Sequence, residues 1–309
     1  MNCPICSKNA QMISHATLAP WICSIFGEPR QLSKLFLCVH CDFRFFSLRY
    51  SEKQVHILYN AYRGNNYFSI RNRWEPWYQK SENNLYNPDI SIRNIERRRS
   101  LMSRELRMAN VSRNFRRALD YGGDTGQFFP ENVSGERYLV DISGFNDIDS
   151  RIRTVRKVTE IPSGSVDLVM ACMVLEHVSY FELFCKEVSD VMTSDGLLYV
   201  ELPLDGFKVH KRHKSEGYRC YLSFLNKIPP LFILMDLISG VVRNYFRMIP
   251  VFGVVKQSEH INYFTKQSIN SLLNGRFDVR YSSPEYYDER HGKLRFGFQA
   301  TIASKKTSI

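Results

Sequence analysis

The chain has 309 residues, of which 44% are hydrophobic and 24% charged, so it is long enough for one large domain or two smaller ones and is not a disordered chain. Its 42 Lys and Arg outnumber 31 Asp and Glu, a net charge of +11, which favours polyanionic partners such as nucleic acid, nucleotide-linked substrates or an anionic membrane face. Residues 1–10 are polar and lack the apolar core of a signal peptide, and the most apolar run, residues 228–242, is too short to span a bilayer. These features predict a cytoplasmic, reducing location, where cysteines serve as thiols or metal ligands rather than as disulfides.

The first fifty residues contain two Cys-x₂-Cys pairs, Cys3–Cys6 and Cys38–Cys41, with 31 residues between them. Each pair places two thiolates on one turn, which is half of a tetrahedral zinc site. Two pairs fill all four positions, so the spacing predicts a closed, structural Zn²⁺ site in a small β-rich module over residues 1–50, whose metal compensates for a poor core. Unrelated buried cysteines are the alternative. The remaining cysteines lack metal spacing and are expected to be core thiols: Cys23, Cys172, Cys185 and Cys220.

Residues 51–117 are expected to form a helical and aromatic connecting region. Tyrosines and tryptophans alternate with arginines over residues 59–78, a composition that suits stacking on a base or sugar and binding of phosphate. Packing between domains is the alternative. Residues 91–117 carry nine arginines against two glutamates, and their apolar residues predict an imperfect amphipathic helix with a solvated charged face or, alternatively, a face for substrate or nucleic acid.

From residue 118 onward, short apolar runs alternate with helical stretches. The runs "RALDY", "RYLVDIS", "SVDLVMAC" and "DGLLYVELP" are typical of strands. Helices are expected to begin at "GQFFPENV" and to cover residues 173–192. This alternation predicts a parallel sheet with helices on both faces, and ligands of such sheets bind beyond the carboxyl ends of the strands.

A glycine-rich loop stands at one of these strand ends. Gly122, Gly123 and Gly126 follow the first strand, and Asp141 follows the second, 15 residues after Gly126. Glycine suits a tight turn, but a loop without side chains also lets a ligand approach the backbone. A carboxylate at the next strand end can accept hydrogen bonds from both hydroxyls of a ribose. The pattern therefore indicates an adenosine-bearing ligand, although its spacing is not G-x-G-x-x-G.

The segments "LDYGGDTGQF", "LVDIS", "VDLVMACMVLEHV" and "DGLLYVELP" resemble the successive motifs of class I S-adenosylmethionine (SAM) dependent methyltransferases. In the family pattern acid-x-Gly-x-Gly-x-Gly, Asp120, Gly122 and Gly126 match, and Asp124 replaces the middle glycine. The resemblance implies an α/β, Rossmann-like, seven-stranded sheet within residues 118–309, with residues 276–283 and 296–304 as candidates for its antiparallel end. It also implies donor contacts from Asp120, Gly122, Gly123, Gly126 and Asp141, and Glu160 is a candidate for the adenine amino group.

Methyl transfer to oxygen or carbon also needs a general base. Two Glu-His pairs are candidates, Glu176–His177 after the fourth strand and Glu259–His260 before the helical residues 265–275. With its cysteine pairs, "YNAYRG", the donor motifs and "EHINYF", the chain is similar to zinc-containing sugar methyltransferases, which act on deoxysugar nucleotides and surface-polysaccharide precursors. The similarity implies active-site roles for Tyr62 (or Tyr59), His177, Glu259 and His260. Architectural and helix-capping roles are the alternatives for the two pairs, and because the family's "YHEH" is "QSEH" here, the acceptor atom stays open.

Residues 206–257 form an expected insertion that is basic at first and then apolar. A hydrophobic core helix is the expectation, and a lid over the acceptor or peripheral contact with the inner membrane face are alternatives. The sequence and the resemblance together predict SAM-dependent methylation of a small-molecule or glycan acceptor. This acceptor is expected to carry phosphate and to be a nucleotide-linked sugar or a precursor in polysaccharide biosynthesis. An RNA methyltransferase of the ribosomal-RNA type is the first alternative, which the charge favours, although no RNA-binding module is recognised. A non-catalytic zinc- and SAM-binding protein is the second.

Overall fold

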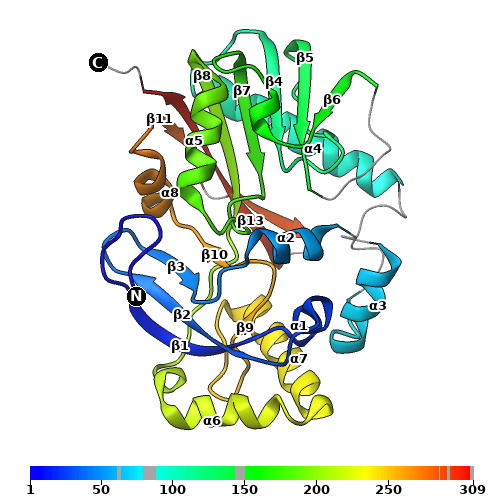
Figure 1. Cartoon of the computed structure of the whole chain (residues 1–309), viewed down its shortest axis with the longest axis vertical. Coiled ribbons are helices and arrows are strands. Elements are labelled where there is room, and N and C mark those ends of the chain that lie inside the picture. Colours follow the sequence, from blue (N-terminus) through cyan, green and yellow to red (C-terminus); the bar gives the residue numbers. More distant parts are fainter. Residues whose placement is uncertain (61–63, 79–87, 143–149, 285, 291–292, 307–309) are drawn as a thin grey trace. The chain divides into compact units, whose positions relative to one another are not determined.

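The computed structural model describes residues 1–60, 64–78, 88–142, 150–284, 286–290 and 293–306 (Figure 1). The chain divides into two compact units. The first unit comprises residues 1–83 and 205–265, and the second unit comprises residues 84–204 and 266–309. This division differs from the expected boundaries, because the residues expected as an insertion in the methyltransferase domain fold together with the N-terminal residues.

The first unit contains a five-stranded sheet in the order β10-β3-β2-β1-β9. Its strands are β1 (Gln11–Leu18), β2 (Leu32–Cys38), β3 (Phe43–Phe46), β9 (Lys256–Gln257) and β10 (Asn262–Tyr263). β1, β2 and β3 form an antiparallel meander, to which β10 adds antiparallel beside β3 and β9 adds parallel beside β1. Residues 256–263 therefore complete both edges of the N-terminal sheet, which protects those edges from pairing with other chains.

Helices from both chain segments belong to this unit. They are α1 (Pro20–Phe26), α2 (Glu52–Tyr59), α3 (Asn65–Trp74), α6 (Glu216–Leu225) and α7 (Pro229–Phe246), with a 3₁₀-helix at Lys211–Lys214. One cluster of buried side chains joins Leu35 and Phe46 of the sheet to Leu222 and Phe232 of α6 and α7. The N-terminal residues therefore share a sizeable core with the later segment, and the expectation of a poor core in a separate module is wrong. None of the helices in the described ranges is long and apolar enough to cross a membrane.

The aromatic stretch of residues 59–78 contributes to a second cluster in the same unit. Tyr67 and Tyr78 are buried, and Tyr67 meets Trp21 edge-to-face with ring centroids 5.4 Å apart. The Arg71 guanidinium lies 4.0 Å from the ring centroid of Tyr78. These rings are thus committed to the core of the first unit, which rules them out as an exposed stacking platform. Of the other residues noted in this stretch, Tyr62 and Arg63 lie outside the described residues.

The second unit contains the expected seven-stranded sheet, in the order β11-β13-β8-β7-β4-β5-β6, with β12 pairing on β13. Its strands are β4 (Phe115–Tyr121), β5 (Val133–Val140), β6 (Ile152–Val155), β7 (Val166–Cys172), β8 (Met192–Pro203), β11 (Phe277–Ser282), β12 (Tyr286–Arg290) and β13 (Lys293–Lys305). β4 to β8 are parallel to one another, whereas β13 is antiparallel to both β8 and β11. The α/β class and the antiparallel last strand are therefore confirmed, with β13 as that strand.

The helices of the second unit are α4 (Pro88–Met108), α5 (Phe181–Val191) and α8 (Lys266–Leu273). The basic helix expected within residues 91–117 is α4, but it ends at Met108, and residues 115–117 belong to β4. α4 buries Met102 and Leu106 in the core of this unit. Its Arg98 does not belong to a solvated face, because it forms an ion pair of 2.5 Å with the buried Glu201 of β8.

Two expected helices differ from the structure. Residues 122–132, where the run "GQFFPENV" predicted a helix, form turns. Gly122, Asp124 and Gly126 have φ of 71°, 58° and 67°, a left-handed conformation that an α-helix excludes, and Pro130 follows within the same stretch and has no N–H for a helical bond. The helix expected over residues 173–192 begins only at Phe181, after a series of turns.

Candidate functional site

The glycine loop and Asp141 lie against one another at the carboxyl ends of β4 and β5. The Gly122 N–H donates to the Val140 carbonyl at 2.7 Å, and the Asp124 N–H donates to the Asp141 carboxylate at 2.7 Å. Since β4 and β5 are adjacent and parallel, the two strand ends open on the same edge of the sheet. Asp141 is thereby held beside the loop at the position where ligands of parallel sheets bind.

Three observations show why the loop needs residues without side chains. A Cβ atom at Gly122 would lie 2.8 Å from the side chain of Val174, which follows β7, and one at Gly126 would lie 2.8 Å from Ile152. A Cβ atom at Gly123 would lie 2.0 Å from the carboxyl carbon of Asp120. The bare backbone at Gly123 is therefore what makes room for the Asp120 carboxylate.

Asp120 is an unusual feature of this site. Its side chain is fully buried, and neither carboxylate oxygen has a hydrogen-bond partner among the described residues. Burial raises the pKa of this carboxyl to about 7. The positive charge of Arg98 lowers the pKa and the negative charge of Asp141 raises it, but both effects are smaller than that of burial. A buried carboxylate without partners costs free energy, which a ligand that brings a cation or donor groups would recover. Asp120, Asp141 and the bare loop therefore fit an adenosyl ligand that carries a ribose and positive charge.

Glu160, the candidate for an adenine contact, lies in a 3₁₀-helix at Val158–Glu160 after β6. Its Oε1 accepts hydrogen bonds from the N–H groups of Arg156 and Lys157 at 3.1 and 3.0 Å. Glu160 thus stabilises the local turn, a structural role that spacing alone did not reveal.

Glu176 and His177 follow β7 at the same edge of the sheet as the glycine loop. Glu176 is buried, and its Oε1 lies 3.9 Å from Nε2 of the partly exposed His177. The His177 N–H donates to the Val174 carbonyl at 2.9 Å, so the pair sits on the turn whose Val174 side chain faces Gly122. The Glu176–His177 pair can therefore support the glycine loop through this turn, and it can also act as an acid–base pair.

His260, in the first unit, has a partner that sequence reasoning missed. Its Nδ1 lies 2.6 Å from Oδ2 of Asp205, and 33% of its side chain is exposed. Arg243 donates to the Asp205 carbonyl at 2.7 Å. Burial raises the pKa of the Asp205 carboxyl, but the charges of His260 and Arg243 outweigh this effect and hold the pKa below its ordinary value. A carboxylate that accepts from Nδ1–H leaves Nε2 as the basic nitrogen of the imidazole, the arrangement of a general base with an orienting acid.

Glu259 has a different environment from its neighbour. It is buried, accepts a hydrogen bond from the Tyr67 hydroxyl and forms an ion pair with Arg71 at 3.2 Å. The ion pairs continue from Arg71 to Glu75 at 2.7 Å and from Glu75 to Lys256 at 2.6 Å, and Lys256 also contacts Asp236 of α7. These contacts make Glu259 an anchor of the loop that carries His260. The tyrosine that contacts Glu259 is thus Tyr67. The resemblance instead implied an active-site role for Tyr62, which lies outside the described residues, or for Tyr59 of α2.

That network explains one strongly shifted pKa. Burial alone would raise the pKa of Glu75, but the charges and hydrogen bonds of Lys256 and Arg71 lower it to about 2. Glu75 is therefore ionised at every physiological pH and also accepts from the Trp21 indole N–H at 3.2 Å. The sequence signal that could have indicated this network is the Arg71–Glu75 spacing of four residues, which suits a helical ion pair.

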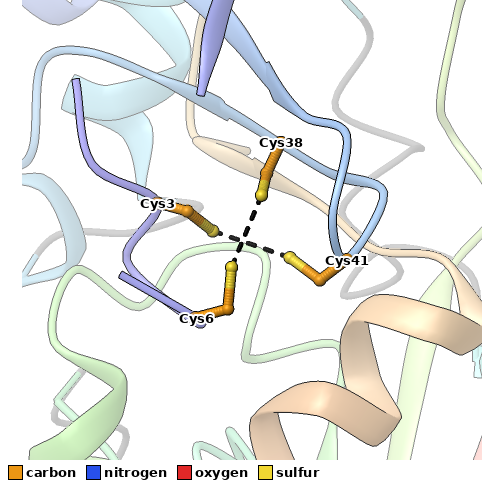
Figure 2. Close-up of side chains that lie close together, drawn as sticks. All are labelled: Cys3, Cys6, Cys38 and Cys41. Atoms are coloured by element: carbon orange, nitrogen blue, oxygen red, sulfur yellow. Dashed lines mark hydrogen bonds between the residues drawn. The ribbon is translucent and has the colours of Figure 1, made fainter. Parts of the chain in front are cut away.

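The four cysteines of the two Cys-x₂-Cys pairs converge in the first unit (Figure 2). The Sγ atoms of Cys3 and Cys41 are 3.6 Å apart, those of Cys6 and Cys38 are 3.4 Å apart, and all four lie within 4.8 Å of one another. Four thiolates bound to tetrahedral Zn²⁺ at about 2.3 Å would be about 3.8 Å apart. The donor set and its spacing therefore fit a zinc ion. Among the other cysteines Cys220 is exposed, so the expectation that it is a core thiol is wrong.

A family model described as "Methyltransferase domain" matches residues 93–276, more than half of the chain. Among solved structures, a Pyrococcus horikoshii protein is 12% identical with a TM-score of 0.41 and covers 78% of this chain and 99% of its own. A SAM-dependent methyltransferase of Archaeoglobus fulgidus is 16% identical, with a TM-score of 0.39 and coverage of 67% and 94%.

A third solved structure is the 1,6-didemethyltoxoflavin-N1-methyltransferase of Burkholderia thailandensis with bound S-adenosylhomocysteine. It is 13% identical, with a TM-score of 0.38, and covers 69% of this chain and 78% of its own. No curated protein matches the chain significantly.

Proposed function

Because the chain belongs to the methyltransferase-domain family, we propose that it transfers a methyl group from SAM to a small-molecule or glycan acceptor, namely a phosphate-bearing nucleotide-linked sugar or surface-polysaccharide precursor. The observation that carries the donor assignment is the glycine loop bonded to Asp141 beside the buried Asp120, whose carboxylate has no hydrogen-bond partner in the described part of the chain. SAM supplies a methyl group on a cationic sulfonium. In this proposal Asp141 accepts from the ribose hydroxyls, Asp120 faces the positive charge of the methionine moiety, and Glu160 contributes to the adenine end.

The second part of the proposal assigns acceptor deprotonation to His260. Asp205 holds the proton on Nδ1, so Nε2 takes the proton of the acceptor as its oxygen or carbon attacks the methyl carbon. The bond between the methyl carbon and sulfur breaks, its electron pair stays on sulfur, and S-adenosylhomocysteine leaves. Asp205 then stabilises the imidazolium that forms. Glu259 positions this histidine through its buried contacts with Tyr67 and Arg71. His177 is the competing candidate base.

The third part assigns a structural Zn²⁺ to Cys3, Cys6, Cys38 and Cys41. All four ligands come from protein, which leaves no open position for a substrate or a reactive water. The metal would join the N-terminal turn to the β2–β3 connection, because Cys38 ends β2 and Cys41 precedes β3. Its role is therefore to stabilise the first unit.

Transfer of label from methyl-labelled SAM identifies the acceptor class. Incubation of the purified protein with extract fractions is expected to place label in nucleotide-sugar or glycan precursors, because such acceptors carry the phosphates that a basic surface attracts. Label in ribosomal RNA would instead establish the RNA methyltransferase alternative. Failure to bind SAM at millimolar concentration in calorimetry would overturn methyl transfer altogether and leave the zinc assignment standing.

The affinity for SAM is expected to rise with pH up to about 7. Asp120 must be ionised to pair with a cation, and its pKa in the ligand-free protein is about 7, so below this value the affinity falls by up to about tenfold per pH unit. The stability of the ligand-free protein changes with pH in the opposite direction to the SAM affinity. Since the folded state binds this proton more tightly than the unfolded state does, Asp120 makes the ligand-free protein less stable as pH rises from about 4 to 7.

Calorimetric titrations with SAM between pH 5.5 and 8.5 measure the effect. Asp120→Asn serves as the matched control: it keeps the shape of the side chain, and its SAM affinity should be weak and independent of pH in this range. A wild-type affinity that is equally flat would show that Asp120 does not face the donor's charge.

A further inference from the structure

Helix α7 of the first unit has the reverse of the usual pattern of a surface helix. Its buried stripe consists of Phe232, Asp236 and Ser239. Its opposite face exposes five large apolar side chains: Leu234 by 51%, Leu237 by 39%, Ile238 by 40%, Val241 by 47% and Tyr245 by 56%. A soluble helix normally buries its apolar stripe, so the expectation of a plain core helix in this insertion is wrong.

Buried polar contacts fix α7 in this orientation. The Asp236 carboxylate is paired with Lys256, and the Ser239 hydroxyl accepts from the Val254 N–H at 2.7 Å and donates to the Met235 carbonyl at 2.5 Å. Rotation of the helix to bury its leucines would leave these polar groups without partners, at a cost of about 1–3 kcal/mol for each. The apolar face is therefore a stable property of the first unit.

Further large apolar side chains are exposed at the end of α7 and in the chain before and after it. They are Phe224, Ile228, Phe246, Met248 and Phe252. α6, which carries Phe224, lies beside α7 in the first unit (Figure 1). An exposed apolar helix face such as that of α7 marks an interaction site more often than chance exposure does. The ten residues from α6 to residue 252 are called the apolar face below.

Basic side chains adjoin this face. The Lys208 N–H donates to the Arg247 carbonyl at 2.7 Å, and the Ile249 N–H donates to the Lys208 carbonyl at 2.9 Å, so the basic segment 208–214 is joined to the chain just after α7. Lys208, Lys211, Arg212 and Lys214 in that segment are exposed. Residues 206–257 hold nine Lys and Arg against two acids. Those acids are the buried Asp236 and Glu216, which pairs with Arg219.

We propose that the apolar face and the basic segment 208–214 dock the protein on the surface of an anionic lipid bilayer. Apolar side chains that enter the boundary between headgroups and acyl chains, flanked by Lys and Arg that contact anionic headgroups, are the chemistry of interfacial helices. A second copy of this chain fits less well, because residues 206–257 have a net charge of +7 from nine bases and two acids and two such faces would repel each other.

Co-sedimentation of the full-length protein with vesicles tests this proposal. Binding is expected to vesicles of phosphatidylcholine mixed with phosphatidylglycerol, at physiological salt, and not to vesicles of phosphatidylcholine alone. The double variant Leu237→Asp/Val241→Asp should lower the partition coefficient at least tenfold. Lys211→Ala/Arg212→Ala should lower it about thirtyfold, and high salt should do the same to the wild type. The matched control is Leu183→Asp, which alters a leucine of α5 in the second unit that is also 47% exposed and should bind like the wild type.

Three results would overturn the proposal. The first is absence of binding to the anionic vesicles, and the second is binding that both double variants leave unchanged. The third is a dimer in analytical ultracentrifugation that Leu237→Asp/Val241→Asp dissociates, which would assign the apolar face to a second copy. All substituted side chains are exposed, and far-UV circular dichroism verifies the fold of each variant. The lysine–arginine variant changes no apolar contact and decides the question if the aspartate variant does not fold.

Discussion

Replacing His260 with glutamine is expected to lower the rate of methyl transfer by about 10²–10⁴-fold, the usual contribution of a general base. Glutamine keeps a similar reach but has no nitrogen that takes a proton near neutral pH. The affinity for SAM should not change, because Asp120, Gly122 and Asp141 belong to the second unit and none of their contacts described above involves His260. Single-turnover rates with labelled SAM, together with calorimetric SAM binding, measure the two effects separately.

Two further variants sharpen this test. Asp205→Asn keeps the shape of the partner and removes its charge, so the rate should fall about 10- to 100-fold. The acidic limb of the pH–rate profile should move to lower pH, since a carboxylate favours the imidazolium. A merely structural role of Asp205 would alter the melting temperature without moving that limb. His177→Gln makes the same change in the other Glu-His pair, and if it abolishes transfer while His260→Gln does not, the base is His177.

The double substitution Cys38→Ser/Cys41→Ser is expected to remove one zinc ion per chain and to unfold the first unit. Structural zinc sites bind with apparent free energies of about 10–16 kcal/mol, which is as large as the entire stability of an ordinary domain, about 5–15 kcal/mol. Elemental mass spectrometry measures the loss of zinc. Near-UV circular dichroism of the buried Trp21 measures the unfolding of the first unit. A chelator strong enough to strip the wild type should produce the same loss.

Cys220→Ser is the matched control for the zinc prediction. Cys220 is exposed on α6 and lies outside the cluster of four thiols, so its replacement should leave both metal content and melting temperature unchanged. Wild-type protein that is purified without zinc and melts at the same temperature with and without added metal would contradict the assignment.

The donor half of the site could be predicted from sequence because its signals are local. The glycine loop and Asp141 each stand directly after an apolar run, and adjacent parallel strands bring such positions to one edge of a sheet. The helix predicted after the loop was wrong for a local reason as well. Three left-handed residues and Pro130 occupy the few positions between β4 and β5, and the general rule that a helix follows such a loop did not account for them.

The first unit could not be predicted in the same way, because its contacts join residues far apart in the chain. β9 pairs with β1 and β10 pairs with β3 through only two residues each, and strands this short leave no periodic pattern. The partner of His260 is 55 residues before it, within a plain "PLDG" run. Composition also did not distinguish buried from exposed positions, since Tyr67 lies in the core whereas Val241 faces outward.

The pairing of the N-terminal meander with residues 256–263 has a consequence for biosynthesis. A ribosome delivers β1, β2 and β3 roughly 200 residues before their edge strands, at about 5–20 residues per second, so for about ten seconds or more the meander has two open edges and lacks the core that α6 and α7 supply. All four thiols of the proposed zinc site have emerged by then, and zinc capture at that stage would hold the nascent sheet in register while the rest of its unit is still being translated. Supply of the metal during translation, rather than after it, would then determine the yield of folded protein.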